Sequence, residues 1–367
     1  MDSLTNSESH SRRFAHVGII FAILGLLLFA HFVRKAGISE IVEGIKRLGV
    51  AFLLILGISA IRYIARSLAW MKCVEPPCRL PFRDAFAARL MGDALGNIVP
   101  LASVAVAEPS KAAFVRDRVP LMAGLSAVAL ENIFYSLSVG LLIFSGTTAL
   151  LLSFPLPKPL RFASIALLVT TAVITLVGYL VIHKQWRFLS DTLSFLGRHG
   201  GRTSWLQKVI PRAETLEARI YGFYDRNRGR LLPIFALEVC FHLAGIAEIY
   251  TTLWFISDVL APTLLTAFIL ESVNRVINVV FKFVPLRTGV DEAGTGMLSS
   301  VLGFTTAIGV TLAIIRKALD IFWATIGVAL MAHRGLSVKG VSKNTEEAVA
   351  LSSAAAEAPS LPAGDSG

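Results

Sequence analysis

Long apolar runs separated by short polar segments dominate the pattern of this chain. Each run approaches or exceeds the roughly 20 apolar residues that cross a bilayer as a helix. The runs are continuous, whereas the strands of an outer-membrane barrel alternate apolar and polar residues. We therefore predict an all-α polytopic membrane protein with about six full transmembrane spans, at 16–33, 48–70, 120–145, 160–183, 231–256 and 304–332. The first span should be retained, because no small-residue cleavage site follows it.

Two further segments, 83–114 and 262–300, are too interrupted by glycine, proline and charge to be ordinary lipid-facing spans. The second contains ESVNRVINVVFKFVP, in which five polar residues share one helix face roughly 100° wide. They are Glu271, Asn274, Arg275, Asn278 and Lys282. A central charge facing lipid costs ~2.5 kcal/mol or more, so this stripe should face a hydrated cavity or a polar partner. Alternatively, Glu271 and Arg275 pair within the helix while the asparagines join helices.

The two interrupted segments match each other in sequence. Both contain VPL, with polar residues 11, 7 and 3 positions before the proline, an acidic residue 8 or 7 positions after it, and a charged residue 31 positions after it. The first set is Arg89, Asp93, Asn97, Pro100, Glu108 and Glu131, and the second is Asn274, Asn278, Lys282, Pro285, Glu292 and Arg316. Nearly the same number of positions separates each residue of the first set from its match in the second. The two segments therefore predict an internal repeat.

We interpret the two segments as re-entrant hairpins that turn near Pro100 and near Pro285, Gly289 and Gly294. Three predicted spans separate them, and an odd number of crossings inverts the second copy. The hairpins should therefore enter from opposite membrane faces and meet near the midplane, as in many secondary transporters. The sequence leaves open whether the repeat-related Glu131 and Arg316 pair with each other.

The composition indicates a membrane protein, and we expect no nucleic-acid partner. The 367 residues are 54% hydrophobic and 16% charged, and the mean hydropathy is +0.67. Much of the net charge of +10 lies in the loop 184–230, which has ten Lys/Arg and four Asp/Glu. Basic loops stay cytoplasmic, which places both termini in the cytoplasm but leaves the basic loop 34–47 on the wrong side. Around a core at 16–333, we expect disordered tails at 1–15 and 334–367.

Two motifs resemble a known family. VPLRTGVDEAGTGMLSSVLG, at 284–303, resembles the proline, glycine-valine, glutamate and glycine element of the lysylphosphatidylglycerol synthase transmembrane family, also called flippase-like domain proteins. NIVPLASVAVAEPSKAAFVRDRVP, at 97–120, resembles its partner element, although Ala105 and Val106 stand where the family usually has a glycine pair. The resemblance covers roughly residues 16–333.

This resemblance implies a multi-pass protein of the bacterial inner membrane that moves lipids between leaflets. The second motif looks closest to members associated with hopanoid and envelope-lipid production. Some members also carry an aminoacyltransferase domain that builds the lipid. We expect no lipid aminoacylation by this chain, because only a short polar tail follows the last predicted span.

The leading hypothesis is a lipid flippase or scramblase that moves a polar, anionic headgroup through a hydrated cavity between the hairpins. Arginine binds phosphate through its planar fork of donors and lysine as a point charge, and Arg62 or Arg66 could assist. The predicted substrate-binding and translocation residues are Arg89, Asp93, Asn97, Glu108, Glu131, Glu271, Asn274, Arg275, Asn278, Lys282, Glu292 and Arg316. The expected partners are membrane lipids, either an anionic phospholipid or a hopanoid or envelope lipid, and lipid-synthesis enzymes.

Two other functions compete with this one. Glu238 and His242 lie one turn apart with Glu248 further along, which would suit an intramembrane lipid phosphatase or headgroup transferase, although such a pair is more often structural. A non-transporting partner of a lipid-synthesis complex would instead show a polar stripe consumed by internal salt bridges. We expect no enzymatic activity, cofactor or metal, since Cys73 and Cys78 lack a second Cys pair or a nearby His and no ATP-binding phosphate loop is present.

Overall fold

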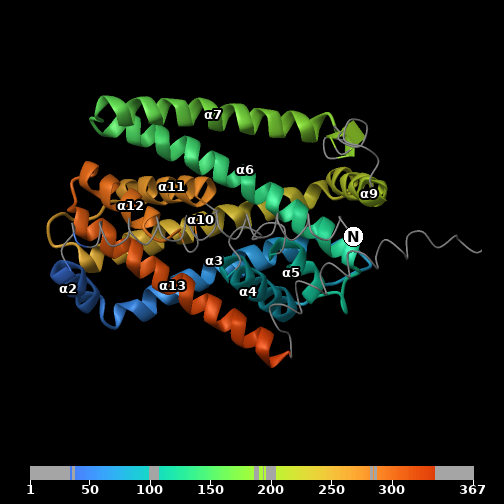
Figure 1. Ribbon diagram of the computed structural model, residues 1–367, viewed down its shortest axis with the longest axis horizontal. Coiled ribbons are helices and arrows are strands. Elements are labelled where there is room, and N and C mark those ends of the chain that lie inside the picture. Colours follow the sequence, from blue (N-terminus) through green and yellow to red (C-terminus); the bar gives the residue numbers. More distant parts are fainter. Residues whose placement is uncertain are drawn as a thin grey trace, which may run out of the picture.

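The computed structural model describes residues 34, 38–98, 107–185, 190–192, 194–195, 204–281, 284 and 287–334. Every secondary-structure element in these ranges is a helix (Figure 1), which confirms the predicted all-α class. The helices are α2 (Ile38–Leu48), α3 (Ala51–Cys73), α4 (Phe82–Ile98), α5 (Glu108–Phe114), α6 (Leu121–Ser153), α7 (Lys158–His183), α9 (Ser204–Arg226), α10 (Arg228–Ile256), α11 (Leu264–Val280), α12 (Val290–Val301) and α13 (Thr306–His333). Outside the described ranges lie the predicted span 16–33, the tails 1–15 and 335–367, and Pro100, Lys282 and Pro285.

Four helices are long and apolar enough to cross a membrane, namely α3, α6, α7 and α10. Each corresponds to one predicted span. The last predicted span, 304–332, forms the single 28-residue helix α13, which carries Arg316, Lys317 and Asp320 near its middle. Because it carries these three charges, α13 is not among the four helices apolar enough to cross a membrane. Arg316 and Lys317 bind carboxylates inside the bundle.

Two groups of helices repeat the same order. The groups α3–α6 and α10–α13 each consist of a long helix, a helix–break–helix element and a second long helix. Helix α3 packs along α10, while α4 packs on α13 and α11 packs on α6, so each element packs on the last helix of the other group. The amphipathic helices that precede the groups follow the same exchange, since α2 packs on α13 and α9 packs on α6. Corresponding helices of the two groups therefore make corresponding contacts.

The two helix–break–helix elements lie toward opposite ends of the molecule. In Figure 1, α4 and α5 lie in the half that also holds α9, and α11 and α12 lie in the half that holds α2. A hydrophobic core fills each end, one including Trp70 and Met91 and the other including Ile249 and Leu270. Helix α7 packs along α6 at the edge and exposes many apolar side chains, as a lipid-facing helix does.

Capping residues set several of the helix boundaries. Thr263 caps α11 in a capping box with Thr266, and the Thr305 side chain caps α13. Gly289 precedes α12 with a φ of 83°, a conformation that favours glycine. The Oε2 atom of Glu292 accepts a hydrogen bond from the N–H of Gly289 at 2.7 Å. Gly289 therefore lies at the turn that leads into α12.

Glycines on α6 and α13 allow α11 and α4, respectively, to approach these helices closely. Gly146 of α6 lies against Ser272 of α11, and Gly327 of α13 lies against the backbone of Leu90 in α4. A Cβ atom at either glycine would overlap these neighbours. Gly294, a predicted turn residue, instead lies inside α12 and faces α11. Small residues at these positions have the role they commonly have between membrane helices.

Candidate functional site

A buried cluster of ion pairs, here called the α4 network, surrounds Glu131 on α6. Arg66 of α3 donates to Oε1 of Glu131 at 2.7 Å, and Arg89 of α4 donates to the same oxygen at 3.0 Å. Arg66 also lies 3.7 Å from Glu238 of α10. Both glutamates are completely buried. Four different helices therefore bring charged side chains to one point in the interior.

The α4 network continues to the short helix α5 through Asn132. This side chain accepts from Arg66 at 3.2 Å and donates to Oε2 of Glu108 at 2.8 Å. The ammonium group of the buried Lys111 lies 2.9 Å from Glu108 and 2.8 Å from Asp93. Lys111 thus joins α5 to α4. The full set is Arg66, Arg89, Asp93, Glu108, Lys111, Glu131, Asn132 and Glu238.

A second cluster, here called the α11 network, surrounds the buried Glu271. Arg275, one turn later on α11, pairs with Oε1 of Glu271, and Arg316 of α13 donates to Oε2 at 2.9 Å. Arg316 also lies 3.2 Å from Glu248 of α10, and Arg62 of α3 donates to Glu248 at 3.0 Å. These five residues make up the α11 network.

Two further buried contacts join α12 to its neighbours. Glu292 pairs with Lys317 of α13 and also caps the N-terminus of α12. The Oδ1 atom of Asn274 accepts a hydrogen bond from Oγ1 of Thr295 at 3.3 Å. Like Lys111 beside α5, Lys317 places a cation beside the second half of a helix–break–helix element.

The two networks meet at the aromatic ring of Phe241 on α10. Arg62 and Arg66 lie one turn apart on α3, with guanidinium carbons 4.9 Å and 5.7 Å from the ring centroid. Arg275 approaches the same ring to 4.9 Å, and Arg66 also lies 4.0 Å from the ring centroid of Tyr135. Aromatic faces attract guanidinium groups. Phe241 therefore holds three cations near one another without adding a negative charge.

The two networks together hold as many cations as carboxylates. The cations are Arg62, Arg66, Arg89, Lys111, Arg275 and Arg316, and the carboxylates are Asp93, Glu108, Glu131, Glu238, Glu248 and Glu271. Within the described residues, donor atoms of Arg62 and Arg89 and acceptor atoms of Glu131, Glu238 and Glu248 have no hydrogen-bond partner. Unpartnered buried polar groups are costly. This region therefore keeps hydrogen-bonding capacity for a polar group that enters the bundle.

Comparison with protein families places this geometry in context. Residues 15–328 match the family described as the lysylphosphatidylglycerol synthase TM region. The chain belongs to this family. No curated protein and no solved structure matches it. Membership confirms the family resemblance and indicates a membrane protein of lipid metabolism or transport.

In this family member, the described residues of the predicted polar stripe on α11 lie largely against protein. Glu271, Asn274 and Arg275 are buried, and Asn278 is half-buried. Glu271 and Arg275 pair within the helix, as the alternative interpretation predicted, and Arg316 adds a second cation. Of the two environments predicted for the stripe, the structure shows polar partners.

The matching residues of the first element also come together. Arg89, Asp93, Glu108 and Glu131 all belong to the α4 network, whereas Asn97 is half-buried near the end of α4. The repeat-related Glu131 and Arg316 do not form the pair left open by the sequence. Glu131 binds arginines of the α4 network, and Arg316 binds glutamates of the α11 network.

Several participants were not predicted as site residues. Lys111 is one of them, although its spacing of three residues from Glu108 allows an ion pair on one helix. Glu248 was considered only for catalysis. Lys317 gave no signal beyond its position next to Arg316.

Glu238 and His242 do not form the acid–base pair considered from the sequence. The Nε2 atom of His242 lies 3.0 Å from Oγ of Ser138, which itself donates to the carbonyl of Tyr135 at 2.8 Å. The carbonyl of Tyr135 can only accept, so the Ser138 proton lies toward it, and the two contacts together fit the histidine tautomer with its proton on Nε2. In the described ranges, no group of three or more potential metal ligands occurs. The contact is best explained as a structural hydrogen bond.

Proposed function

We propose that this protein moves a lipid with a polar, anionic headgroup between the two leaflets of the bacterial inner membrane. The observation that carries the proposal is the arginine-rich seam between α3 and α10, where the two buried networks meet. A headgroup needs polar partners throughout the hydrocarbon core, and the seam places such partners in the middle of an apolar bundle. Family membership supports a role in lipid transport.

In this proposal, the glutamates form ion pairs with the arginines when no lipid is bound. A buried guanidinium without a partner costs several kcal/mol, of order 3–5, so an arginine must exchange one anion for another as a headgroup passes. A phosphate presents acceptors that match the guanidinium fork. Arg66 and Arg62 are separated by one helical turn, about 5.4 Å, so a phosphate could pass from the α4 network to the α11 network in a short step. The acyl chains would remain in lipid beside the bundle.

The proposed membrane arrangement has about six spans and two opposed re-entrant hairpins, α4–α5 and α11–α12. Their positions toward opposite ends of the molecule support an inverted repeat (Figure 1). The basic loop 34–47, which conflicted with the predicted topology, contributes the amphipathic helix α2, and its Arg47 pairs with Glu43 and Asp258. Because its charge is partly balanced, this helix could lie at the outer interface, with both termini cytoplasmic.

A non-transporting partner of a lipid-synthesis complex is the second candidate function. It is favoured by the internal pairing of Glu271, Arg275 and Arg316, which leaves these polar side chains occupied within the protein. Unpartnered polar atoms remain in both networks, as donors on Arg62 and Arg89 and as acceptors on Glu131, Glu238 and Glu248, and this favours translocation instead. An exclusively structural network would gain more from complete pairing.

The proposal can be tested with purified protein in vesicles that carry a fluorescent anionic phospholipid in both leaflets. An impermeant reductant added outside bleaches only the outer leaflet unless lipid crosses. The protein should make nearly all of the fluorescence accessible. Arg66→Lys and Arg275→Lys keep the charge but lose the planar fork, and each should slow bleaching about tenfold, which corresponds to about 1.4 kcal/mol.

Arg118→Lys is the matched control, because its side chain is mostly exposed and lies outside both networks. It should bleach as the parent protein does. Bleaching that stops at the outer leaflet with the parent protein would contradict translocation and favour the non-transporting partner.

A further inference from the structure

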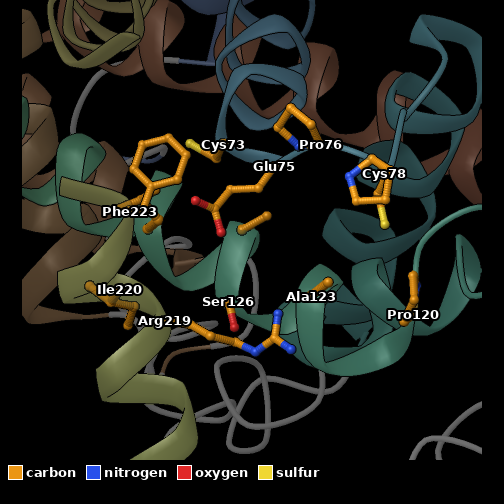
Figure 2. Close-up of a pocket in the computed structure, with 13 residues that line it drawn as sticks. Cys73, Glu75, Pro76, Cys78, Pro120, Ala123, Ser126, Arg219, Ile220 and Phe223 are labelled. Atoms are coloured by element: carbon orange, nitrogen blue, oxygen red, sulfur yellow. The ribbon is translucent and has the colours of Figure 1, made fainter. Parts of the chain in front are cut away.

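A cavity of about 250 Å³ lies where the end of α3, the first turns of α6 and the amphipathic helix α9 meet (Figure 2). Its walls include Cys73, Leu130 and Phe223. Leu130 directly precedes Glu131, the centre of the α4 network, in the sequence of α6. The cavity lies on the side of the molecule where α9 lies.

Arg219 is the cation that this cavity presents. Figure 2 shows its side chain extending from α9 toward Ala123 and Ser126 in the first turns of α6. Arg219 is exposed, and among the described residues it forms no ion pair. The cavity also has an acidic residue, Glu75, but this carboxylate is already bound by Arg226. The unmatched charge of the cavity is therefore positive.

The start of α6 adds to this positive character. Pro120, which lines the cavity, is the N-cap residue of α6, and no side chain there accepts from the first N–H groups. The positive end of the α6 dipole therefore lies near one end of the cavity, where Pro120 forms part of its wall.

The remaining walls are mostly apolar, including Leu130, Ile220 and Phe223. The volume is below the ~300–1,000 Å³ of a pocket that encloses a drug-sized molecule. It suits a headgroup and the first atoms of a glycerol backbone better than whole acyl chains. Amphipathic helices such as α9 commonly lie at the membrane interface, where headgroups are located.

We propose that this cavity is the site where a phosphate-bearing lipid headgroup is loaded, and that Arg219 recognises the phosphate. This inference rests on the proposed translocation, for which it supplies the first binding step. From the cavity, the phosphate would move toward Arg66 and Arg89 of the α4 network. Free phosphate has the same chemistry, so the test must separate the two sources.

Cys78 provides a natural reporter, because it lines the cavity and is partly exposed. In full-length protein carrying Cys73→Ala and Cys240→Ser, the rate of maleimide labelling of Cys78 would be measured in detergent. The additions would be a short-chain phosphatidylglycerol, the corresponding short-chain diacylglycerol, or inorganic phosphate. Saturable protection by the phosphatidylglycerol alone is the expected result.

Arg219→Gln should raise about tenfold the phosphatidylglycerol concentration that gives half-maximal protection. A tenfold change corresponds to losing about 1.4 kcal/mol of charge-assisted hydrogen bonding. Arg228→Gln is the matched control, since Arg228 is exposed, pairs with Asp225 and does not line the cavity. It should leave the protection unchanged.

Three results would overturn the inference: no protection by any addition, equal protection by diacylglycerol, or protection that survives Arg219→Gln. Equal protection by inorganic phosphate would overturn the lipid assignment and identify a free-anion site.

Protection of Cys78 by phosphatidylglycerol without lipid movement in vesicles would instead overturn the proposed translocation. Lipid movement that Arg219→Gln leaves unchanged would overturn only the loading site.

Discussion

Arg62 and Arg66 lie one turn apart on α3, yet they bind carboxylates of two different networks. Arg66 reaches Glu131 and Glu238, whereas Arg62 reaches Glu248. The α3–α10 contact therefore brings charged side chains of both helix groups together beside the two networks. A small movement of α3 along α10 would change the pairing in both networks together.

Replacing Glu271 with Gln should strongly destabilise the protein. Glu271 is completely buried and binds both Arg275 and Arg316. Removing one partner of a buried ion pair typically costs about 3–5 kcal/mol, which should lower the Tm in detergent by roughly 5 °C or more. Thermal unfolding followed by size-exclusion chromatography measures this effect.

Asp258→Asn is the control for this variant, because it breaks an exposed pair with Arg47. Exposed pairs contribute little, so its Tm should stay close to that of the parent. Equal losses in the two variants would argue against a buried α11 network.

Replacing Lys111 with Met should loosen α5 from α4. The change leaves Asp93 and Glu108 without their shared cation while keeping a side chain of similar length. Because both carboxylates are partly exposed, the expected loss of stability is about 1–3 kcal/mol. The Met variant should be cleaved faster by protease between α4 and α5, while Arg118→Met, which removes an exposed cation, should be cleaved at the parent rate. Unchanged cleavage of the Lys111 variant would show that the ion pairs do not hold α5.

Replacing Gly327 with Ala should disturb the packing of α13 on α4. A Cβ atom at Gly327 would overlap the carbonyl of Leu90, and backbone atoms cannot move aside easily. Overpacking of this kind costs about 1–3 kcal/mol. Gly57→Ala is the matched control, because its Cβ would meet no neighbour within 4 Å and alanine favours a helix by about 0.5–1 kcal/mol. The two variants should therefore shift the Tm in opposite directions, and a Gly327 variant at least as stable as the parent would contradict the described helix contact.

Much of the fold could be predicted from the pattern of apolar residues. The spans that became α3, α6, α7 and α10 are long and continuous, so their length alone predicts them. The helix–break–helix elements were also indicated, because glycine, proline and charge interrupt otherwise apolar segments. Local periodicity could not show the exchange of α4 and α11 between the two groups, because that contact joins residues far apart in the chain.

The charged residues of the site were easier to find than their partners. An isolated charge in an apolar helix must be satisfied somewhere, which is why Glu131, Glu271 and Arg316 were predicted as important. Which carboxylate meets which arginine depends on helix rotation and depth, and these are set by tertiary packing. Lys111 could not be predicted for this reason, since a lysine at a helix end usually reaches solvent but here is buried beside Asp93 of α4.

The central structural claim of the account is that the two helix–break–helix elements enter the membrane from opposite faces. Single cysteines at 105 and 288, in a cysteine-free background, would be labelled with an impermeant thiol reagent from each side of sealed vesicles. Thr288 is used because its neighbour Gly289 is buried and has a positive φ that disfavours cysteine. The account predicts labelling of residue 105 from the cytoplasmic face and of residue 288 from the opposite face. Labelling of both positions from the same face would contradict the inverted repeat and, with it, a continuous polar route for lipid headgroups.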